Sequence, residues 1–208
     1  MSNHAHDPDD HHFEHHDPRS PRLRVEALED LLTEAGIIEP TRVDATIEKY
    51  ENEIGPMVGA RLVARAWIEP EFRERLLGDA DAVIADEGIR GAEIEHIEVK
   101  ANEPGVHNVV VCTLCSCYPW AVLGLPPNWY KSPEYRARVV REPRAVLREM
   151  GLEFESETEV RIWDSSSETR FLVLPERPAG TEDLGVDELA ELVSRDSMIG
   201  VARATSPS

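Results

Sequence analysis

Three cysteines within six residues constrain this chain more than any other feature. They are the only cysteines of the 208-residue chain, and they lie in the segment Cys112–Cys117. The β-branched run Val109–Val111 leads into the segment and predicts a buried strand. Pro119, on the far side, ends regular pairing because proline has no backbone N–H to donate. The sequence therefore predicts three thiols on a tight loop that leaves the end of a strand.

Two familiar uses of clustered cysteines fit this spacing poorly. A disulfide would leave one thiol over, and Cys115 and Cys117 are too close in sequence for an easy bridge. A structural zinc site needs four ligands, usually drawn from two separated pairs, and the chain has no second cysteine pair. A soft, thiolate-rich site for a transition metal remains as the interpretation.

Main-chain nitrogens of the loop can complete such a site. If Cys115, Ser116 and Cys117 wrap one metal ion, the backbone nitrogens of Ser116 and Cys117 come within reach and close small chelate rings. Cys112 can add a third sulfur, which leaves one position of an octahedron open. Binding through deprotonated amides requires a strongly Lewis-acidic ion, so the spacing favours a trivalent metal over zinc.

The loop and its flanks resemble the α subunit of nitrile hydratase. The resemblance covers roughly residues 22 to 202. The matching segments are Tyr50–Pro56, Val111–Trp120, Leu123–Tyr130, Tyr135–Arg144, Trp163–Glu168, Arg177–Thr181 and Ser197–Gly200. Thr113 resembles the cobalt branch of the family, because the iron branch usually carries Ser at that position.

The resemblance implies a ligand set and a reaction. It implies that Cys112 is an unmodified thiolate, that Cys115 is oxidised to sulfinic acid, and that Cys117 is oxidised to sulfenic acid. Ser116 and Cys117 would add amide nitrogens around one non-corrin Co(III), with cobalt favoured over iron. The implied reaction is the hydration of a nitrile to an amide, in which the metal polarises the nitrile or activates water. The sulfenate of Cys117 would be a nucleophile or base.

The same resemblance implies partners. Family members receive two arginines from a β subunit, which offset the charge of the oxidised cysteines, and the loop of this chain carries no arginine. We therefore expect the site to be incomplete without the β subunit. A cobalt-loading accessory protein and a small nitrile substrate are the other expected partners.

Three further residues near the cluster have both a functional and a structural interpretation. Trp120 can line a substrate pocket, or it can be a core or interface residue. Asp164 and Glu168 can orient the loop, together with Thr113, or orient the arginines of the β subunit, or they can cap a turn. Asn108 departs from a histidine pair that is common in the family. Glu93 stands where family members often carry Gln, so substrate preference and hydrogen bonding around the ligands stay open.

The chain divides by composition into three parts. Residues 1–20 carry six histidines among Asp and Pro and are predicted to be disordered, either as a weak metal-binding tail or as an inert one. Residues 21–90 predict a helical arm, which in the family embraces the β subunit and which could instead dock on this chain's own core. Residues 91–202 predict the metal-binding catalytic domain.

Hydrophobic periodicity predicts an α/β (α+β) fold class. Helices are expected over about 23–35, ending at Gly36, over 41–54 with Thr41 as N-cap, and over 57–68, 70–87, 132–150 and 187–195. Strands are expected at 94–100, 108–112, 160–163 and 171–174. With the resemblance, this pattern predicts a helical arm followed by a layered α-β-β-α domain with mixed sheets.

Composition excludes several classes of protein. A formal net charge of −19 makes nucleic acid and anionic membrane surfaces poor partners. No apolar run approaches the length of a membrane span, and an odd cysteine count argues against a secreted disulfide scaffold, so we expect a cytoplasmic protein. Two alternatives stay open, namely the cobalt-bearing subunit of thiocyanate hydrolase and a non-catalytic metal-binding or redox-sensing protein.

Overall fold

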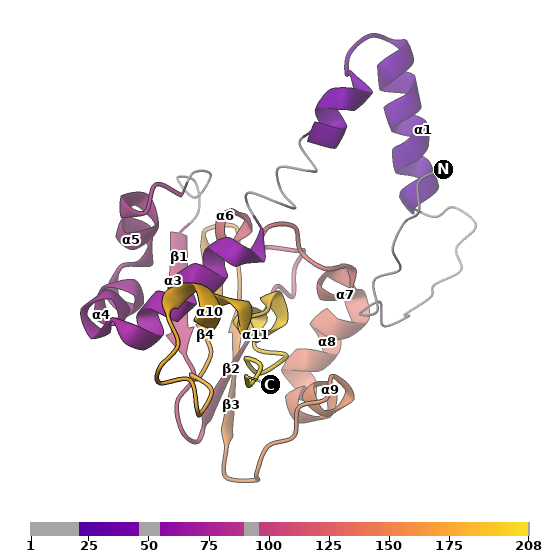
Figure 1. Ribbon diagram of the computed structural model, residues 1–208. Coiled ribbons are helices and arrows are strands. Elements are labelled where there is room, and N and C mark those ends of the chain that lie inside the picture. The colour runs from indigo at the N-terminus through magenta and orange to yellow at the C-terminus, as the bar shows by residue number, and fades with distance from the viewer. Residues whose placement is uncertain (1–20, 46–54, 90–95, 208) are drawn as a thin grey trace. The chain divides into compact units, whose positions relative to one another are not determined.

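The computed structural model describes residues 21–45, 55–89 and 96–207 (Figure 1). By its internal contacts the chain divides into two compact units, residues 1–47 and 48–208. The histidine-rich tail and Glu93 lie outside the described residues, so the predictions made for them stay predictions.

The first unit contains helix α1 (Pro21–Glu34) and a second helix whose described part covers residues 40–45. Gly36 follows α1 with φ of +66°, a conformation that glycine adopts readily, so the predicted stop is confirmed. The prediction that Thr41 is an N-cap is wrong. Pro40 occupies the first position of the helix, where its missing N–H costs nothing, and Thr41 lies one residue inside.

Three helices open the described part of the second unit: α3 (Pro56–Ile68), α4 (Pro70–Gly78) and α5 (Ala80–Asp86). The predicted helix over 70–87 is two helices, because Asp79 interrupts it and accepts a hydrogen bond from the Ala82 amide as the N-cap of α5. All three helices belong to the second unit, since α4 and α5 pack against strand β1 and α3 packs against α10. The prediction that residues 21–90 form an arm that embraces a β subunit stays a prediction.

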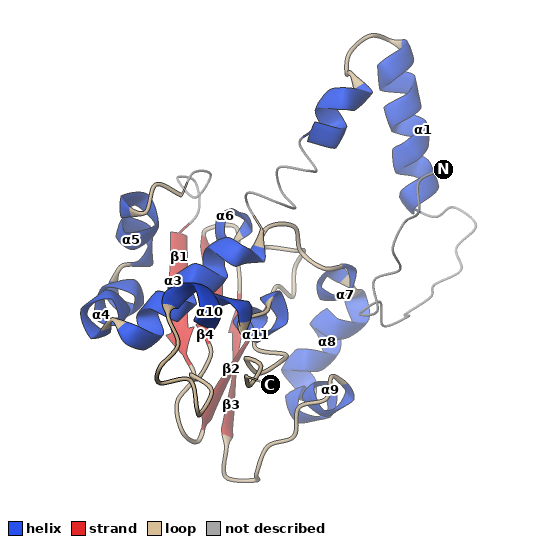
Figure 2. Ribbon diagram, viewed as in Figure 1, coloured by secondary structure: helices blue, strands red, loops and turns tan. Residues whose placement is uncertain are grey.

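In the described part of the chain, four strands form two small parallel sheets (Figure 2). Strand β1 (His96–Ala101) pairs with β4 (Thr169–Leu174), and β2 (Val106–Val111) pairs with β3 (Glu159–Asp164). The α/β class is confirmed, and both pairings of described strands are parallel where mixed sheets were expected. Parallel pairing of β2 with β3 follows from the long helical connection between them, which returns the chain to the starting edge of the sheet.

Most remaining helices lie in that connection or near the C-terminus. They are α6 (Trp120–Leu123), α7 (Asn128–Lys131), α8 (Pro133–Arg141), α9 (Pro143–Glu149), α10 (Val186–Glu191) and α11 (Arg195–Ile199). Pro133 and Pro143 open α8 and α9, as predicted. The predicted helix over 187–195 ends early at Glu191, and α11 follows it after a break.

The core lies around β2. Its residues Val109–Val111 are at most 2% exposed, and helices α3 and α11 pack nearby, α11 against both β2 and β4. Gly200, at the end of α11 with φ of +89°, allows this approach, because a Cβ there would lie 2.0 Å from the carbonyl oxygen of Asn108. The strand that precedes the cysteines is therefore held from several sides. None of the described helices has both the length and the apolar character needed to cross a membrane.

Candidate metal centre

The cysteine loop begins where two parallel strands end together. Register pairs Val111, the last residue of β2, with Asp164, the last residue of β3. Because parallel strands present their carboxyl ends at the same edge, the loop after β2 and the turn after β3 are neighbours. The amide of Ser165 donates to the carbonyl oxygen of Val111 at 2.7 Å, which extends the pairing to the base of the loop.

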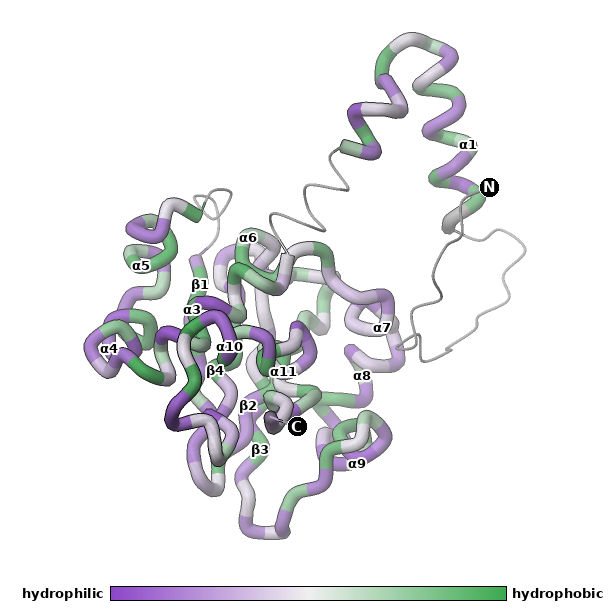
Figure 3. The backbone as a smooth tube through the Cα atoms, viewed as in Figure 1, coloured by the Kyte–Doolittle hydropathy of each residue, from purple (hydrophilic) through white to green (hydrophobic). Residues whose placement is uncertain are grey.

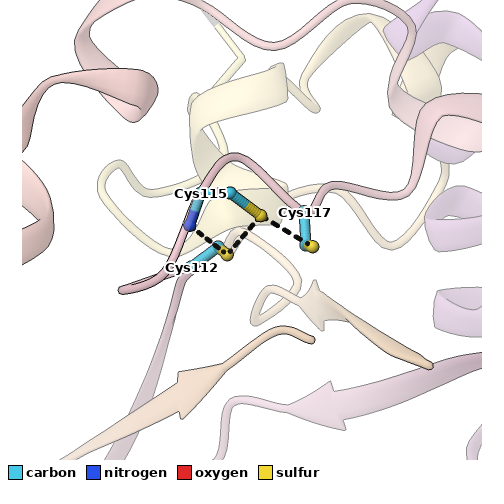
Figure 4. Close-up of side chains that lie close together, drawn as sticks. All are labelled: Cys112, Cys115 and Cys117. Atoms are coloured by element: carbon cyan, nitrogen blue, oxygen red, sulfur yellow. Dashed lines mark hydrogen bonds between the residues drawn. The ribbon is translucent and has the colours of Figure 1, made fainter. Parts of the chain in front are cut away.

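The three thiols point toward one another (Figure 4). Their sulfur atoms all lie within 4.8 Å of one another. Cys115 Sγ is 3.5 Å from Cys112 Sγ and 3.2 Å from Cys117 Sγ, and all three cysteines are free thiols. Cys112 is buried, Cys117 is half-buried and Cys115 is exposed. The predicted grouping of the three cysteines is confirmed, with one sulfur beneath the loop and one open to its surroundings.

The two outer thiols have opposite pKa shifts. Hydrogen bonds with Cys117 and then Cys112 lower the pKa of Cys115 to about 7, and the backbone amides of Ser116 and Cys117 contribute to the shift. Burial, and then the hydrogen bond with Cys115, raise the pKa of Cys117. In the metal-free chain Cys115 therefore ionises before Cys117, and a thiolate is the form that binds metals and oxidises.

The sulfur spacing fits a single metal ion. Two sulfurs bonded to one metal at about 2.3 Å lie about 3.3 Å apart when the angle between the bonds is a right angle, and further apart in a tetrahedron. The observed separations of 3.2 and 3.5 Å match the right-angled arrangement. Cys115 N also donates to Cys112 Sγ at 3.2 Å, so the backbone folds tightly over the buried sulfur. The loop can hold a metal ion through three sulfurs.

Asp164 ties the loop to β3. Its carboxylate accepts from the Thr113 amide at 2.9 Å and from the Thr113 hydroxyl at 2.6 Å. Thr113 and Asp164 are thus brought together, directly after the first cysteine. Glu168 lies on the exposed turn between β3 and β4, where, among the described residues, its carboxylate has no hydrogen bond or ion pair with the loop. The backbone amide of Glu168 donates to the Ser166 hydroxyl within the turn and makes no contact with the loop among the described residues.

Trp120 is the first residue of α6 and is 44% exposed. That exposure excludes a core role within the described part of this chain. A pocket wall and an interface residue remain as its two interpretations, and both require something outside the described residues to cover the indole.

Two buried tyrosines that the sequence analysis did not single out support the loop. Tyr130, on α7, donates from its hydroxyl to the carbonyl oxygen of Cys117 at 2.9 Å. Tyr135, on α8, donates to the carbonyl oxygen of Val110 at 2.8 Å. Both belong to segments that carried the family resemblance, but nothing in their local pattern distinguished them from ordinary core aromatics.

Two arginines of this chain also approach the cluster. Arg136, on α8, donates from Nη1 to the carbonyl oxygen of Cys115 at 3.0 Å. Arg170, on β4, exerts a coulombic attraction that opposes the raised pKa of Cys117. The Nε and Nη1 atoms of Arg170 are buried and have no hydrogen-bond partner among the described residues. The loop carries no arginine of its own, but the fold brings positive charge to it from two other elements.

Asn108 is a buried junction four residues before the first cysteine. Its side-chain amide donates to the carbonyl oxygen of Ala101 at 2.7 Å and to Asn102 Oδ1 at 3.1 Å. Its side-chain oxygen accepts from Trp163 Nε1 at 2.8 Å. Neighbouring His107 contacts the carbonyl oxygen of Gly200 through Nε2 at 2.7 Å. Asparagine at this position therefore links β1, β2 and β3 and has no contact with the thiols among the described residues.

Comparison with known proteins assigns the sequence of this chain to a family. The sequence model described as nitrile hydratase, alpha chain, matches residues 19–202. The chain is 55% identical over 185 residues to the low-molecular weight cobalt-containing nitrile hydratase subunit alpha of Rhodococcus rhodochrous, covering 89% of each chain. It is 41% identical over 188 residues to the thiocyanate hydrolase subunit gamma of Thiobacillus thioparus, covering 85% of this chain and 76% of the relative.

Comparison with solved structures gives the same family. A double mutant of the Fe-type nitrile hydratase from Comamonas testosteroni Ni1 superposes with a TM-score of 0.82 at 40% sequence identity. The match covers 92% of this chain and 93% of the other.

Proposed function

Since the chain belongs to the nitrile hydratase α-chain family, we propose that it is the metal-bearing α subunit of a cobalt-type nitrile hydratase, a lyase that hydrates nitriles to amides. The observation that carries the proposal is the cluster of three free thiols within 4.8 Å on a loop held by a buried strand. Such a cluster is the donor set that a soft transition metal requires.

The proposed ligands are the sulfurs of Cys112, Cys115 and Cys117 and the main-chain nitrogens of Ser116 and Cys117. The proposed metal is one Co(III) per chain, because cobalt-containing relatives share more than half of the sequence, although the structural match above is to an iron-type enzyme. The bound ion supplies Lewis-acid chemistry toward the nitrile or toward water. The residues of this chain hold it, with Cys112 as the buried anchor and Cys115 and Cys117 on the open side.

We further propose that an external oxidant such as dioxygen converts the Cys115 thiol to a sulfinic acid and the Cys117 thiol to a sulfenic acid. An exposed thiol of low pKa is the first to oxidise, and Cys115 has both properties. The sulfenate oxygen of Cys117 would lie beside the open face as nucleophile or base. Arg136 and Arg170 would offset part of the added negative charge from within this chain.

A β subunit is the proposed partner, supplying further arginines to the site, and a cobalt-loading accessory protein is proposed for assembly. Helix α1 supports the need for a partner, because its apolar residues Leu28 and Leu31 are more than half exposed. Trp120 and Leu114, at 44% and 87% exposed, put further apolar surface next to the cysteines. We expect the assembled enzyme in the cytoplasm, where free thiols are kept reduced until they bind metal.

The test is co-purification with the β subunit, followed by elemental analysis, intact mass and activity. We expect one cobalt per α chain, a mass increase of three oxygen atoms, and conversion of acrylonitrile to acrylamide. Zinc in place of cobalt with unoxidised cysteines, or an active complex with no cobalt, would overturn the proposal.

Thiocyanate hydrolase is the second candidate, since its gamma subunit is a relative across most of this chain. Trp120 favours the nitrile enzyme, because the thiocyanate enzyme tends to carry a basic residue at that position. Assaying acrylonitrile and thiocyanate with the same preparation separates the two. A non-catalytic metal or redox sensor would convert neither substrate and would lack the three added oxygens.

A further inference from the structure

Arg136 contacts the cysteine loop through the main chain and not through a thiol. Its guanidinium donates to the carbonyl oxygen of Cys115, in the peptide that joins Cys115 to Ser116. The described part of the chain contains no cis peptide bond, and in a trans peptide the carbonyl oxygen and the next N–H point in opposite directions. Holding the Cys115 oxygen toward α8 therefore directs the Ser116 nitrogen away from α8.

The thiols lie on the side to which that nitrogen points. The backbone amides of Ser116 and Cys117 help to lower the pKa of the Cys115 thiol, which indicates that they lie on its side of the loop, and the Cys115 amide donates to Cys112 Sγ at 3.2 Å. The Tyr130 hydroxyl donates to the carbonyl oxygen of Cys117 at 2.9 Å. The loop thus directs two of its carbonyl oxygens, those of Cys115 and Cys117, to side chains of α8 and α7. The Cys115 nitrogen points instead to the buried sulfur of Cys112, as Figure 4 shows.

Helix α8, which carries Arg136, is fixed to the core and to strand β2. Ser132 caps it by accepting from the Tyr135 amide at 3.1 Å, and Pro133 opens it. Tyr135 is bonded to the carbonyl oxygen of Val110, and Val139 is fully buried, so the residues flanking Arg136 are anchored to β2 and the core. The guanidinium therefore has a defined position relative to the strand that carries the cysteines.

The cost of placing Arg136 there indicates that it serves the loop. Its Nε is buried and has no hydrogen-bond partner within the described ranges. A buried donor without a partner costs stability, and the contact that the Arg136 guanidinium does make among the described residues is with the Cys115 carbonyl oxygen. By contrast Arg138, two residues on, lies at the surface in ion pairs with Glu142 and Glu149.

We propose that Arg136 is a positioning residue of the metal centre, which holds the Cys115–Ser116 peptide plane so that the Ser116 nitrogen faces the three thiols before a metal binds. The inference rests on the proposed function in one respect, namely that the Ser116 nitrogen is a ligand. It adds that the α chain orients this nitrogen by itself, without an arginine from the β subunit.

The experiment compares Arg136→Met and Arg136→Lys with a matched control, Arg141→Met. Arg141 lines the same groove as Arg136 beside Thr113, but it donates to the Ala137 carbonyl of its own helix. Each variant is produced as the complex with the β subunit, once under limiting cobalt and once under saturating cobalt. The measurements are cobalt per α chain, the visible absorption of the cobalt–sulfur centre, and the melting temperature of the complex prepared without cobalt.

We expect Arg136→Met to contain at least fivefold less cobalt than wild type under limiting supply. At saturating cobalt we expect its absorption bands to be shifted, because a nitrogen ligand that is no longer oriented changes the ligand field. Arg136→Lys, with one donor group in place of a planar fork, should fall between the two, and Arg141→Met should stay within twofold of wild type with unshifted bands.

Two results would overturn the proposal. One is an Arg136→Met complex with the cobalt content and bands of Arg141→Met. The other is a variant that loses cobalt together with melting temperature but shows wild-type bands at saturating cobalt, which would mean a purely structural role. The proposed function fails separately, in the wild-type sample, if that sample contains no cobalt or forms no amide.

Discussion

The first unit exposes leucines of its helix α1, whereas the second unit buries the valines of its strand β2. In the first unit, Leu28 and Leu31 of α1 are 56% and 63% exposed, and Figure 3 shows hydrophobic and hydrophilic residues alternating along this helix. In the second unit, Val109–Val111 of β2 are at most 2% exposed. The comparison teaches that the second unit buries the strand that leads into its cysteine loop, whereas α1 keeps apolar side chains exposed on its own surface.

Side-chain size explains part of the difference. Helix α3 carries Gly59, Ala60 and Ala64, and a Cβ at Gly59 would come within 2.8 Å of Met198 Sδ, so this helix approaches its neighbours closely. Helix α1 carries its leucines among charged residues and has no such small-residue face. A helix of that kind gains most of its stability from docking an apolar stripe on something else.

The largest expected effect is on the reaction at the cysteine loop of the second unit. Cys117→Ser should lower nitrile hydration by the αβ complex on the order of 10³-fold or more, because it removes both a metal ligand and the proposed sulfenate. Ser116→Ala is the matched control, since it keeps the main-chain nitrogen and should retain activity within a few-fold. Acrylamide formation measures both. Full turnover by Cys117→Ser would remove the sulfenate from the mechanism.

The next effect is on the strand that supports the loop. Gly200→Ala places a Cβ 2.0 Å from the Asn108 carbonyl oxygen at a φ of +89°, and should destabilise the second unit by about 3 kcal/mol or more. Gly180→Ala is the control, because its φ is +76° but a Cβ there meets nothing within 4 Å. Thermal unfolding of the complex should show a clearly larger drop for Gly200→Ala. Equal drops would mean that backbone conformation alone, and not the contact with β2, sets the cost.

A smaller effect is expected at the arm. The double variant Leu28→Glu, Leu31→Glu should weaken binding of the β subunit at least tenfold, about 1.4 kcal/mol, while the unfolding of the second unit stays unchanged. Asp30→Asn, an exposed position on the same helix, should bind as wild type does. Titration calorimetry with the purified β subunit provides the measurement. An unchanged dissociation constant would show that the exposed leucines do not face the β subunit.

The smallest effect concerns pH. Burial, with a contribution from Arg203, lowers the pKa of His107 below its ordinary value, although the Gly200 carbonyl acts in the opposite direction. The unfolded chain then binds more protons than the folded one below about pH 6.5, so the free energy of unfolding should fall as pH falls through that value. His107→Gln should therefore flatten the decrease in melting temperature between about pH 7 and 5.

His96 is the control, because its pKa is shifted in the opposite direction to that of His107. Its hydrogen bond and ion pair with Asp81 raise the pKa of this exposed histidine, so the pair stabilises the fold at low pH and loses that contribution as pH rises. His96→Gln should steepen the decrease slightly or leave it unchanged. The same slope in wild type and His107→Gln would contradict the role assigned to the buried ring.

Much of the fold was predictable because the signals are local. The four strands lie within two residues of the predicted starts and ends, since β-branched runs bounded by turn residues reflect the environment of each strand directly. Prolines at the first positions of α8 and α9 marked their starts for the same reason. The four-residue helices α6 and α7 and the five-residue α11 escaped prediction, because one turn of helix is too short to show a period.

For the site, the sequence by itself determined the donor atoms. Three thiols within six residues can meet one ion in almost any fold, because the chain between them is too short to separate them. Tertiary structure alone decided what surrounds those thiols. The parallel register of β2 and β3 sets Asp164 beside Thr113 across 51 residues, and the helical connection brings Arg136 to the Cys115 carbonyl across 21. Contacts over such separations depend on strand pairing and helix packing, which no local pattern of residues encodes.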